Sequence, residues 1–126
     1  MENTIKEGDK FIVNKLEYLF EEPKYKDIVL IEAYKNNKKY FIIKRIIGAP
    51  GDTILIEEDK IYINGELIEE EYLKEKINLV NEKLEIKLEE DEVFVMGDNR
   101  SYSRDSRKIG PVKVGRIVGK VISKEN

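Results

Sequence analysis

The sequence predicts a mostly-β fold, a single domain of coiled, barrel-like antiparallel sheets. β-Branched and aromatic residues gather in short runs, several of which alternate apolar and polar positions as half-buried strands do. Glycine, proline and asparagine separate these runs, and Asn64-Gly65 between two alternating runs is a strong hairpin signal. A chain of 126 residues is long enough for one hydrophobic core but not for two, so residues 1–126 are expected to form one domain.

In the first half of the chain, strands are expected wherever β-branched and aromatic residues concentrate. These segments are residues 8–16, 27–34, 40–47, 53–57, 60–63 and 66–68. Residues 17–25 contain Pro23 and are expected to connect two strands, with room for one helical turn. The asparagine pair within 35–39 predicts a hairpin turn, and the glycines and proline of 48–52 predict a tight turn.

In the second half, strands are expected at 84–88 and 93–96. Residues 112–123 are expected to form a final strand or a bent pair of strands, followed by a tail at 124–126. Residues 69–83 fit either a helical face or an irregular arm, since both could be lined by the same four apolar side chains. These are Tyr72, Leu73, Ile77 and Leu79.

The composition excludes several kinds of active site. The chain contains no histidine and no cysteine, so histidine bases, thiol nucleophiles and zinc–thiolate centres are ruled out. Acid–base chemistry near neutral pH is then left to a carboxylate, a lysine or a tyrosine. The 23 basic and 26 acidic residues are interspersed without a basic stripe, so nucleic acid is not expected as a partner.

Lys44 and Arg45 interrupt an otherwise apolar segment, residues 41–47, in which Ile42 and Ile46 share the face of Lys44 if the segment is extended. One interpretation is a lysine at a sheet edge whose amine reaches water. The other is a buried lysine whose pKa falls far enough for the neutral amine to act as a base. The segment by itself leaves both interpretations open.

A polar loop at residues 97–107 follows the apolar strand at 93–96. It contains three arginines, two aspartates and three serines, with almost nothing apolar between them. Such a loop can brace itself with charge-assisted hydrogen bonds and hold a hydroxyl in a fixed position. It is therefore the second candidate for a functional segment.

Both segments resemble motifs of one family. The run from Lys44 to Asp52 resembles the lysine box of bacterial type I signal peptidases, and the loop that starts at Gly97 resembles their C-terminal box. The matching loop residues are Gly97, Asp98, Asn99, Arg100, Ser103, Asp105, Ser106, Arg107 and Gly110. Residues 8–15, 27–29 and 62–73 fit the pattern between the boxes, so the resemblance covers essentially the whole chain.

This family consists of serine–lysine endopeptidases that are anchored in the cytoplasmic membrane and remove N-terminal signal peptides from exported proteins. The resemblance therefore implies a signal-peptidase-like fold, signal peptides of exported preproteins as substrates, and a catalytic domain on the extracytoplasmic face of the cell membrane. It implies no cofactor and no metal. A lysine base also agrees with the absence of histidine.

The resemblance assigns a role to each matching side chain. Lys44 is implied as the general base and Ser103 as the hydroxyl that orients its amine. Two ion pairs are implied as supports of the site, Asp98 with Arg45 and Asp105 with Arg107. Ile43 and Met1 are implied as contacts of the substrate. The remaining loop serines, Ser101 and Ser106, are expected to bond to local backbone.

The nucleophile is expected outside the 126 residues. In the family, a methionine follows the nucleophilic serine, and Met1 falls on that methionine position. The resemblance thus implies that the chain is truncated directly after the serine, with the membrane anchor further upstream. The 126 residues alone are then expected to be inactive.

Two other functions fit parts of the sequence. A non-catalytic β domain could bind exported peptides or a protein partner by adding a strand at a sheet edge. A Ser–Lys peptidase of the self-cleaving repressor type would need a DNA-binding helical domain and an internal Ala-Gly scissile bond, and neither is visible in the sequence.

Overall fold

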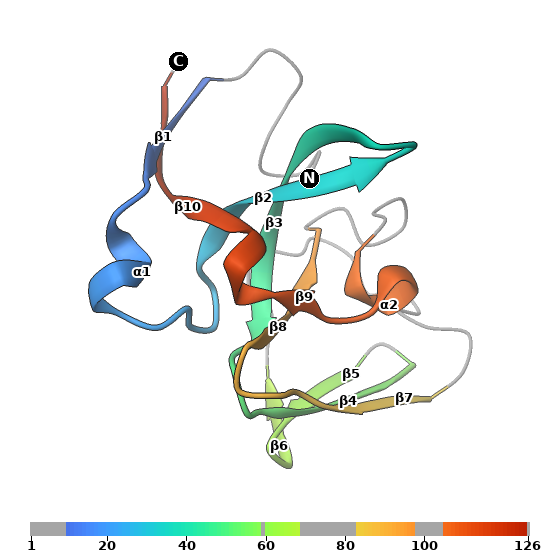
Figure 1. Ribbon diagram of the computed structural model, residues 1–126. Coiled ribbons are helices and arrows are strands. Elements are labelled where there is room, and N and C mark those ends of the chain that lie inside the picture. The colour runs from blue at the N-terminus through green and yellow to red at the C-terminus, as the bar shows by residue number, and fades with distance from the viewer. Residues whose placement is uncertain (1–9, 59, 69–82, 98–104, 126) are drawn as a thin grey trace.

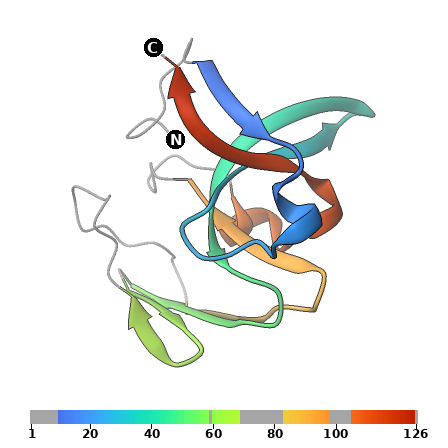
Figure 2. The same ribbon diagram turned by 90° about the vertical axis from the view of Figure 1, so that its left-hand side faces the viewer.

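The computed structural model describes residues 10–58, 60–68, 83–97 and 105–125, and these form two antiparallel sheets (Figure 1). The larger sheet has the strand order β1-β10-β2-β3-β8-β9, and the smaller has the order β6-β5-β4-β7. The mostly-β prediction is confirmed, and the described strands form two open sheets rather than a closed barrel. Figure 2 shows the smaller sheet at one end of the larger one.

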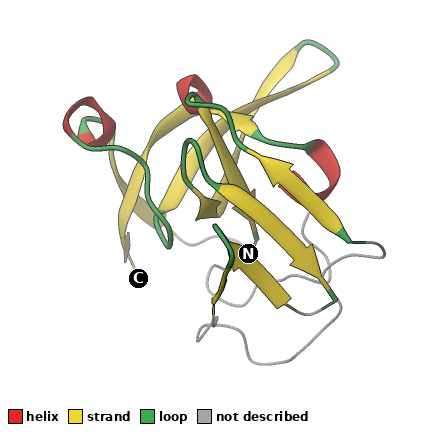
Figure 3. Ribbon diagram, turned by 90° about the horizontal axis from the view of Figure 1, so that it is seen from below, coloured by secondary structure: helices red, strands yellow, loops and turns green. Residues whose placement is uncertain are grey.

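The strands of the larger sheet come from both ends of the described chain. They are β1 (Lys10–Asn14), β2 (Ile28–Lys35), β3 (Lys38–Gly48), β8 (Glu92–Met96), β9 (Val112–Lys113) and β10 (Ile117–Glu125). The smaller sheet consists of β4 (Thr53–Glu57), β5 (Lys60–Ile63), β6 (Glu66–Ile68) and β7 (Leu84–Lys87). Among the described residues, three single helical turns lie between the strands (Figure 3), namely α1 (Glu17–Phe20), α2 (Ser106–Ile109) and the 3₁₀ turn η1 (Val114–Arg116).

Two tight hairpins confirm the turn predictions. Asn36 and Asn37 both have positive φ, 53° and 64°, and lie between the paired residues Lys35 and Lys38. Asn64 and Gly65, with φ of 52° and 86°, connect β5 to β6 in the same way. Positive φ at both central residues is the type I′ geometry, whose twist matches that of the flanking strands.

Strands β3 and β8 are buried on both faces at the point where they pair. One cluster of buried side chains joins the two sheets and consists of Ile47, Ile54, Ile56, Ile61, Leu88, Phe94 and Met96. The other covers the opposite face of the larger sheet and consists of Val29, Ile31, Ile46, Val93, Val95 and Val112. Successive residues of one strand enter opposite clusters, as the two-residue period of a strand requires.

The C-terminal region differs from its expected form in two ways. Residues 112–123 form the bent pair of strands, which is one of the two expected forms, but β10 continues to Glu125 through most of the expected tail. The polar loop contains the helical turn α2, which was not expected. Residues 69–83, for which a helical face and an irregular arm were both expected, lie almost wholly outside the described residues. No described helix is long and apolar enough to cross a membrane.

We predict that Gly119→Ala destabilises the fold by about 1–3 kcal/mol, the usual cost of inserting a methyl group into packed structure. A Cβ at Gly119 would come 2.6 Å from the backbone oxygen of Asn14 and 2.9 Å from the Cα of Lys15. Backbone atoms cannot move aside as a side-chain tip can. The measurement is the midpoint of urea unfolding. Gly115→Ala is the matched control, because a Cβ there meets no described atom within 4 Å, and an equal loss in both variants would contradict the prediction.

Candidate active site

Lys44 lies in the buried part of the larger sheet, in strand β3. It pairs directly with Val29 of β2, so their side chains share a face, and Ile42 and Ile46 of its own strand lie on the same face. Only 8% of Lys44 is exposed to solvent. The interpretation of Lys44 as an edge lysine that reaches bulk water is therefore wrong, and the buried interpretation is confirmed.

The surroundings of Lys44 favour a neutral amine. Burial lowers the pKa of Lys44 below its ordinary value, since an ammonium loses its hydration on entering the protein. The nearby Asp105 carboxylate raises this pKa and the Arg107 guanidinium lowers it. Burial has the largest effect, so the amine gives up its proton more readily than an ordinary lysine does.

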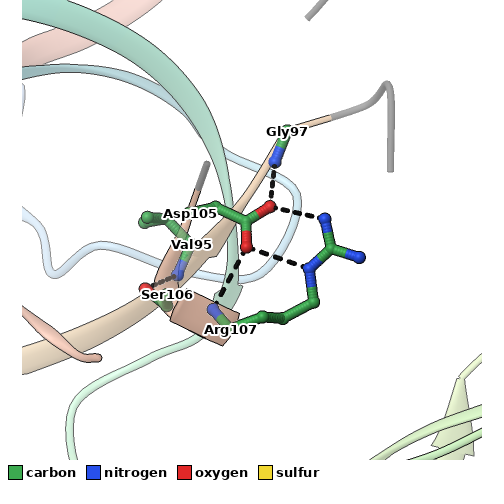
Figure 4. Close-up of polar contacts among 5 residues, drawn as sticks. All are labelled: Val95, Gly97, Asp105, Ser106 and Arg107. Carbon is green, nitrogen blue, oxygen red and sulfur yellow. Dashed lines mark hydrogen bonds and ion pairs between the residues drawn. The ribbon is translucent and has the colours of Figure 1, made fainter. Parts of the chain in front are cut away.

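Asp105 and Arg107 form a buried ion pair beside Lys44, as the resemblance implied (Figure 4). Arg107 donates from Nε to Asp105 Oδ1 and from Nη2 to Asp105 Oδ2, each at 2.9 Å. Asp105 is wholly buried and the Arg107 side chain is 7% exposed. Burial opposes ionisation of Asp105, but Arg107 and the backbone N–H groups of Gly97 and Arg107 outweigh it and hold the pKa of Asp105 below its usual value.

The side chains of Asp105 and Ser106 bind the edge of β8 where no described strand continues. Ser106 Oγ accepts a hydrogen bond from the Val95 N–H at 2.9 Å, and Asp105 Oδ2 accepts one from the Gly97 N–H at 3.0 Å (Figure 4). Val95 and Gly97 are two residues apart, so their N–H groups face the same side of the chain. Ser106 thus binds a backbone group as expected, but this group is not local, because Val95 lies eleven residues away in the core strand β8.

The unexpected turn α2 results from a local signal that was available in the sequence. Asp105 is its N-cap, and Oδ1 accepts a hydrogen bond from the Arg107 N–H at 3.1 Å. Aspartate is among the preferred N-cap residues. Gly110, with φ of 84°, follows the last residue of the turn, which is another common helix stop.

Arg45 and Ile43 lie on the face of β3 opposite to Lys44, because neighbours in a strand point to opposite sides. Arg45 is 9% exposed, and its Nη1 donates to the backbone oxygen of Lys26 at 3.1 Å. Ile43 is partly buried and pairs with Leu30. The Ile43 side chain therefore does not share a surface with the Lys44 amine, although its backbone is adjacent.

Three predicted site residues, Ser103, Asp98 and Met1, lie outside the described residues. The contact of Ser103 with Lys44 and the pairing of Asp98 with Arg45 therefore stay predictions, as does a substrate contact of Met1.

A second buried carboxylate, Asp27, lies on the Lys44 face of the sheet. Its Oδ2 accepts hydrogen bonds from the Tyr18 hydroxyl at 2.8 Å and the Lys24 N–H at 3.2 Å, and its Oδ1 lies 3.6 Å from Lys120 Nζ. Its backbone oxygen accepts a hydrogen bond from the Ile46 N–H at 2.7 Å. Burial and the Asp27 carboxylate raise the pKa of Tyr18 well above its usual value. Asp27, the residue directly before β2, thus helps to fix the end of β3.

Comparisons with known proteins agree on one family. A family model described as signal peptidase, peptidase S26, matches residues 1–124. Signal peptidase I of Bacillus caldolyticus is 41% identical over 94% of this chain and 70% of its own length, and signal peptidase I V of Bacillus subtilis (strain 168) is 35% identical over 99% and 80%. A crystal structure of a signal peptidase I from Enterococcus faecalis V583 matches with a TM-score of 0.66 and 29% identity, over 82% of this chain and 98% of that one.

We predict that Lys44→Met makes the fold more stable and that its advantage depends on pH. The folded-state pKa of Lys44 lies below the unfolded value of 10.5. The cost of burying the protonated amine is therefore complete at pH values below the folded-state pKa, and it vanishes above pH 10.5. Between these two pKa values the advantage of methionine should shrink by about 1.4 kcal/mol per pH unit. Urea unfolding from pH 6 to 11 measures it. Lys38→Met, in an exposed part of β3, is the control, and a pH-independent difference would contradict the prediction.

We also predict that Ser106→Ala destabilises the fold by about 1–3 kcal/mol, because the buried Val95 N–H then loses its acceptor. Thermal unfolding followed by circular dichroism measures the change. Lys108→Ala removes an exposed side chain from the same helical turn and should cost much less. Equal effects of the two changes would show that the hydroxyl is not required.

Proposed function

The chain belongs to the bacterial type I signal peptidases, serine proteases of the peptidase S26 family, and from this membership we propose that Lys44 is the general base of a Ser/Lys dyad. The reaction is hydrolysis of the peptide bond between a signal peptide and the exported protein. Residues 1–126 are proposed to be the catalytic domain of a membrane-anchored protein that works on the extracytoplasmic face.

The observation that carries this proposal is the burial of Lys44 among apolar neighbours, with a lowered pKa. A neutral amine can accept the proton of a serine hydroxyl as that hydroxyl attacks the scissile carbonyl. The ammonium then donates the proton to the leaving amine, and the regenerated amine activates the water that hydrolyses the acyl-enzyme. Ser103 is proposed to orient the amine, and the ion pairs Asp105–Arg107 and Asp98–Arg45 to hold the loop beside it.

The nucleophile is proposed to be a serine directly before Met1, since Met1 occupies the methionine position of the family's serine box. This assignment rests on the resemblance alone. A chain that starts at Met1 is then expected not to cleave, and restoring the serine and an anchor is expected to restore activity.

An open edge of β3 is proposed to bind the substrate as an added strand. Strand β8 pairs with β3 only from Arg45 to Gly48, so no described strand pairs with residues 38–43 on that side. A peptide extended along this edge would run toward Lys44. Ile42 and Ile43 point to opposite faces of the sheet, so each would contact substrate side chains on its own face. Ile43 is thus proposed to bind the substrate through its side chain and its backbone.

We predict that Lys44→Arg abolishes processing in a form that carries the serine and anchor, since a guanidinium is not deprotonated near neutral pH. The expected loss is at least about 100-fold, the lower range for general-base catalysis. Wild-type activity should fall as the pH drops through the pKa of Lys44. Cleavage of a preprotein in lipid vesicles measures both. Lys60→Arg, at an exposed position of β5, is the matched control, and unchanged cleavage by Lys44→Ala would refute the assignment. Binding of signal peptides without cleavage would instead favour the non-catalytic function.

A further inference from the structure

Asp105 creates an electrostatic problem for a lysine base. It is a wholly buried carboxylate, and its charge favours the protonated form of Lys44. An opposite charge at short range in a protein interior usually raises the pKa of a lysine. Asp105 nevertheless has a structural task, since it caps α2 and binds the Gly97 N–H. The Asp105 carboxylate is therefore needed to hold the loop, but its negative charge opposes deprotonation of the Lys44 amine.

Arg107 places a positive charge directly against the Asp105 carboxylate. Its guanidinium contacts both oxygens of Asp105 in a bidentate pair, and it is itself almost fully buried. Each Asp105 oxygen then accepts two hydrogen bonds, one from the guanidinium and one from a backbone N–H. The positive charge of Arg107 acts on Lys44 through the same low-dielectric medium as the negative charge of Asp105, and it acts in the opposite direction.

The other charged groups on this sheet face already form a pair. Asp27 lies directly before β2 and Lys120 lies on β10, and these two form an ion pair with each other at 3.6 Å. Strand β8 contributes apolar residues, among them Val95, and β2 places Val29 directly opposite Lys44. Within the described part of the chain, Asp105 and Arg107 are thus the charges that act on the amine.

We propose that Arg107 is a positioning residue that acts through Asp105: it cancels the Asp105 charge, so that Asp105 can hold the loop beside Lys44 without charging the amine. This inference rests on the proposed role of Lys44 as a base. It concerns the protonation of the amine, however, which can be measured without any cleavage.

The test is an NMR titration of the Lys44 Cε and Nζ signals in the 126-residue chain, with the signals assigned by their loss in Lys44→Met. Arg107→Gln should raise the pKa of Lys44 by about one unit or more, the size expected for an opposite charge nearby that is no longer neutralised. This rise leaves about tenfold less neutral amine at a fixed pH. Asp105→Asn should lower this pKa. The double variant Asp105→Asn/Arg107→Gln should bring it back close to the wild-type value.

A purely structural role for the pair predicts a different pattern. Loss of either partner would then loosen the loop and hydrate Lys44, so the pKa of Lys44 would rise in all three variants and most in the double one. That pattern overturns the proposal. Lys108→Gln removes the same charge from an exposed position of α2 and should leave the pKa of Lys44 unchanged.

A conservative variant keeps the test decisive if Arg107→Gln fails to fold. Arg107→Lys retains the positive charge and loses the bidentate fork. The proposal requires a Lys44 pKa near the wild-type value in this variant, and a rise as large as that expected for Arg107→Gln would overturn it. Failure of the proposed function would appear as absent cleavage with these titrations unchanged, so the two failures are distinguishable.

Discussion

Two-sided burial of strands β3 and β8 is the constraint on which the rest of the structure depends. Both clusters of the core meet along these strands, so Ile46 and Ile47 of β3 and residues 93–96 of β8 are surrounded by buried apolar side chains. Lys44 lies at the border of this segment, between Ile42 and Ile46. Its amine therefore cannot keep a full hydration shell, and the same packing that stabilises the sheet makes the ammonium costly. Stability given up at one residue is a common feature of functional sites.

Backbone groups near the buried lysine are hydrogen-bonded by loop and turn residues where no described strand pairs with them. Asp105 and Ser106 receive the N–H groups of Gly97 and Val95 at the edge of β8. On the other side of β3, the turn before β2 bonds to Ile46, and Asp27 ties this turn to α1 and β10. Unpaired buried N–H groups would be expensive, so these contacts hold the chain segments beside Lys44 in place.

Sequence reasoning located the fold class, most strands and the central lysine, because each of these leaves a local mark. A two-residue hairpin needs asparagine or glycine at positive φ, so the turns at Asn36-Asn37 and Asn64-Gly65 are visible in the residues themselves. A lysine within an apolar strand is equally visible. The helical turn α2 was not predicted, although the N-cap residue Asp105 signalled it, because its four residues are too few to show a helical period.

By itself the sequence determined that no histidine or cysteine could act, that the domain is mostly antiparallel sheet, and, through the resemblance, that Asp105 should pair with Arg107. Only the tertiary structure decided that Lys44 is buried rather than edge-exposed, that Ile43 points away from it, and that Ser106 binds the core strand β8. The physical reason is the separation in sequence between the residues that interact. Turns and caps form between neighbours in the chain, whereas burial depends on segments distant in the sequence that meet only when the sheets assemble.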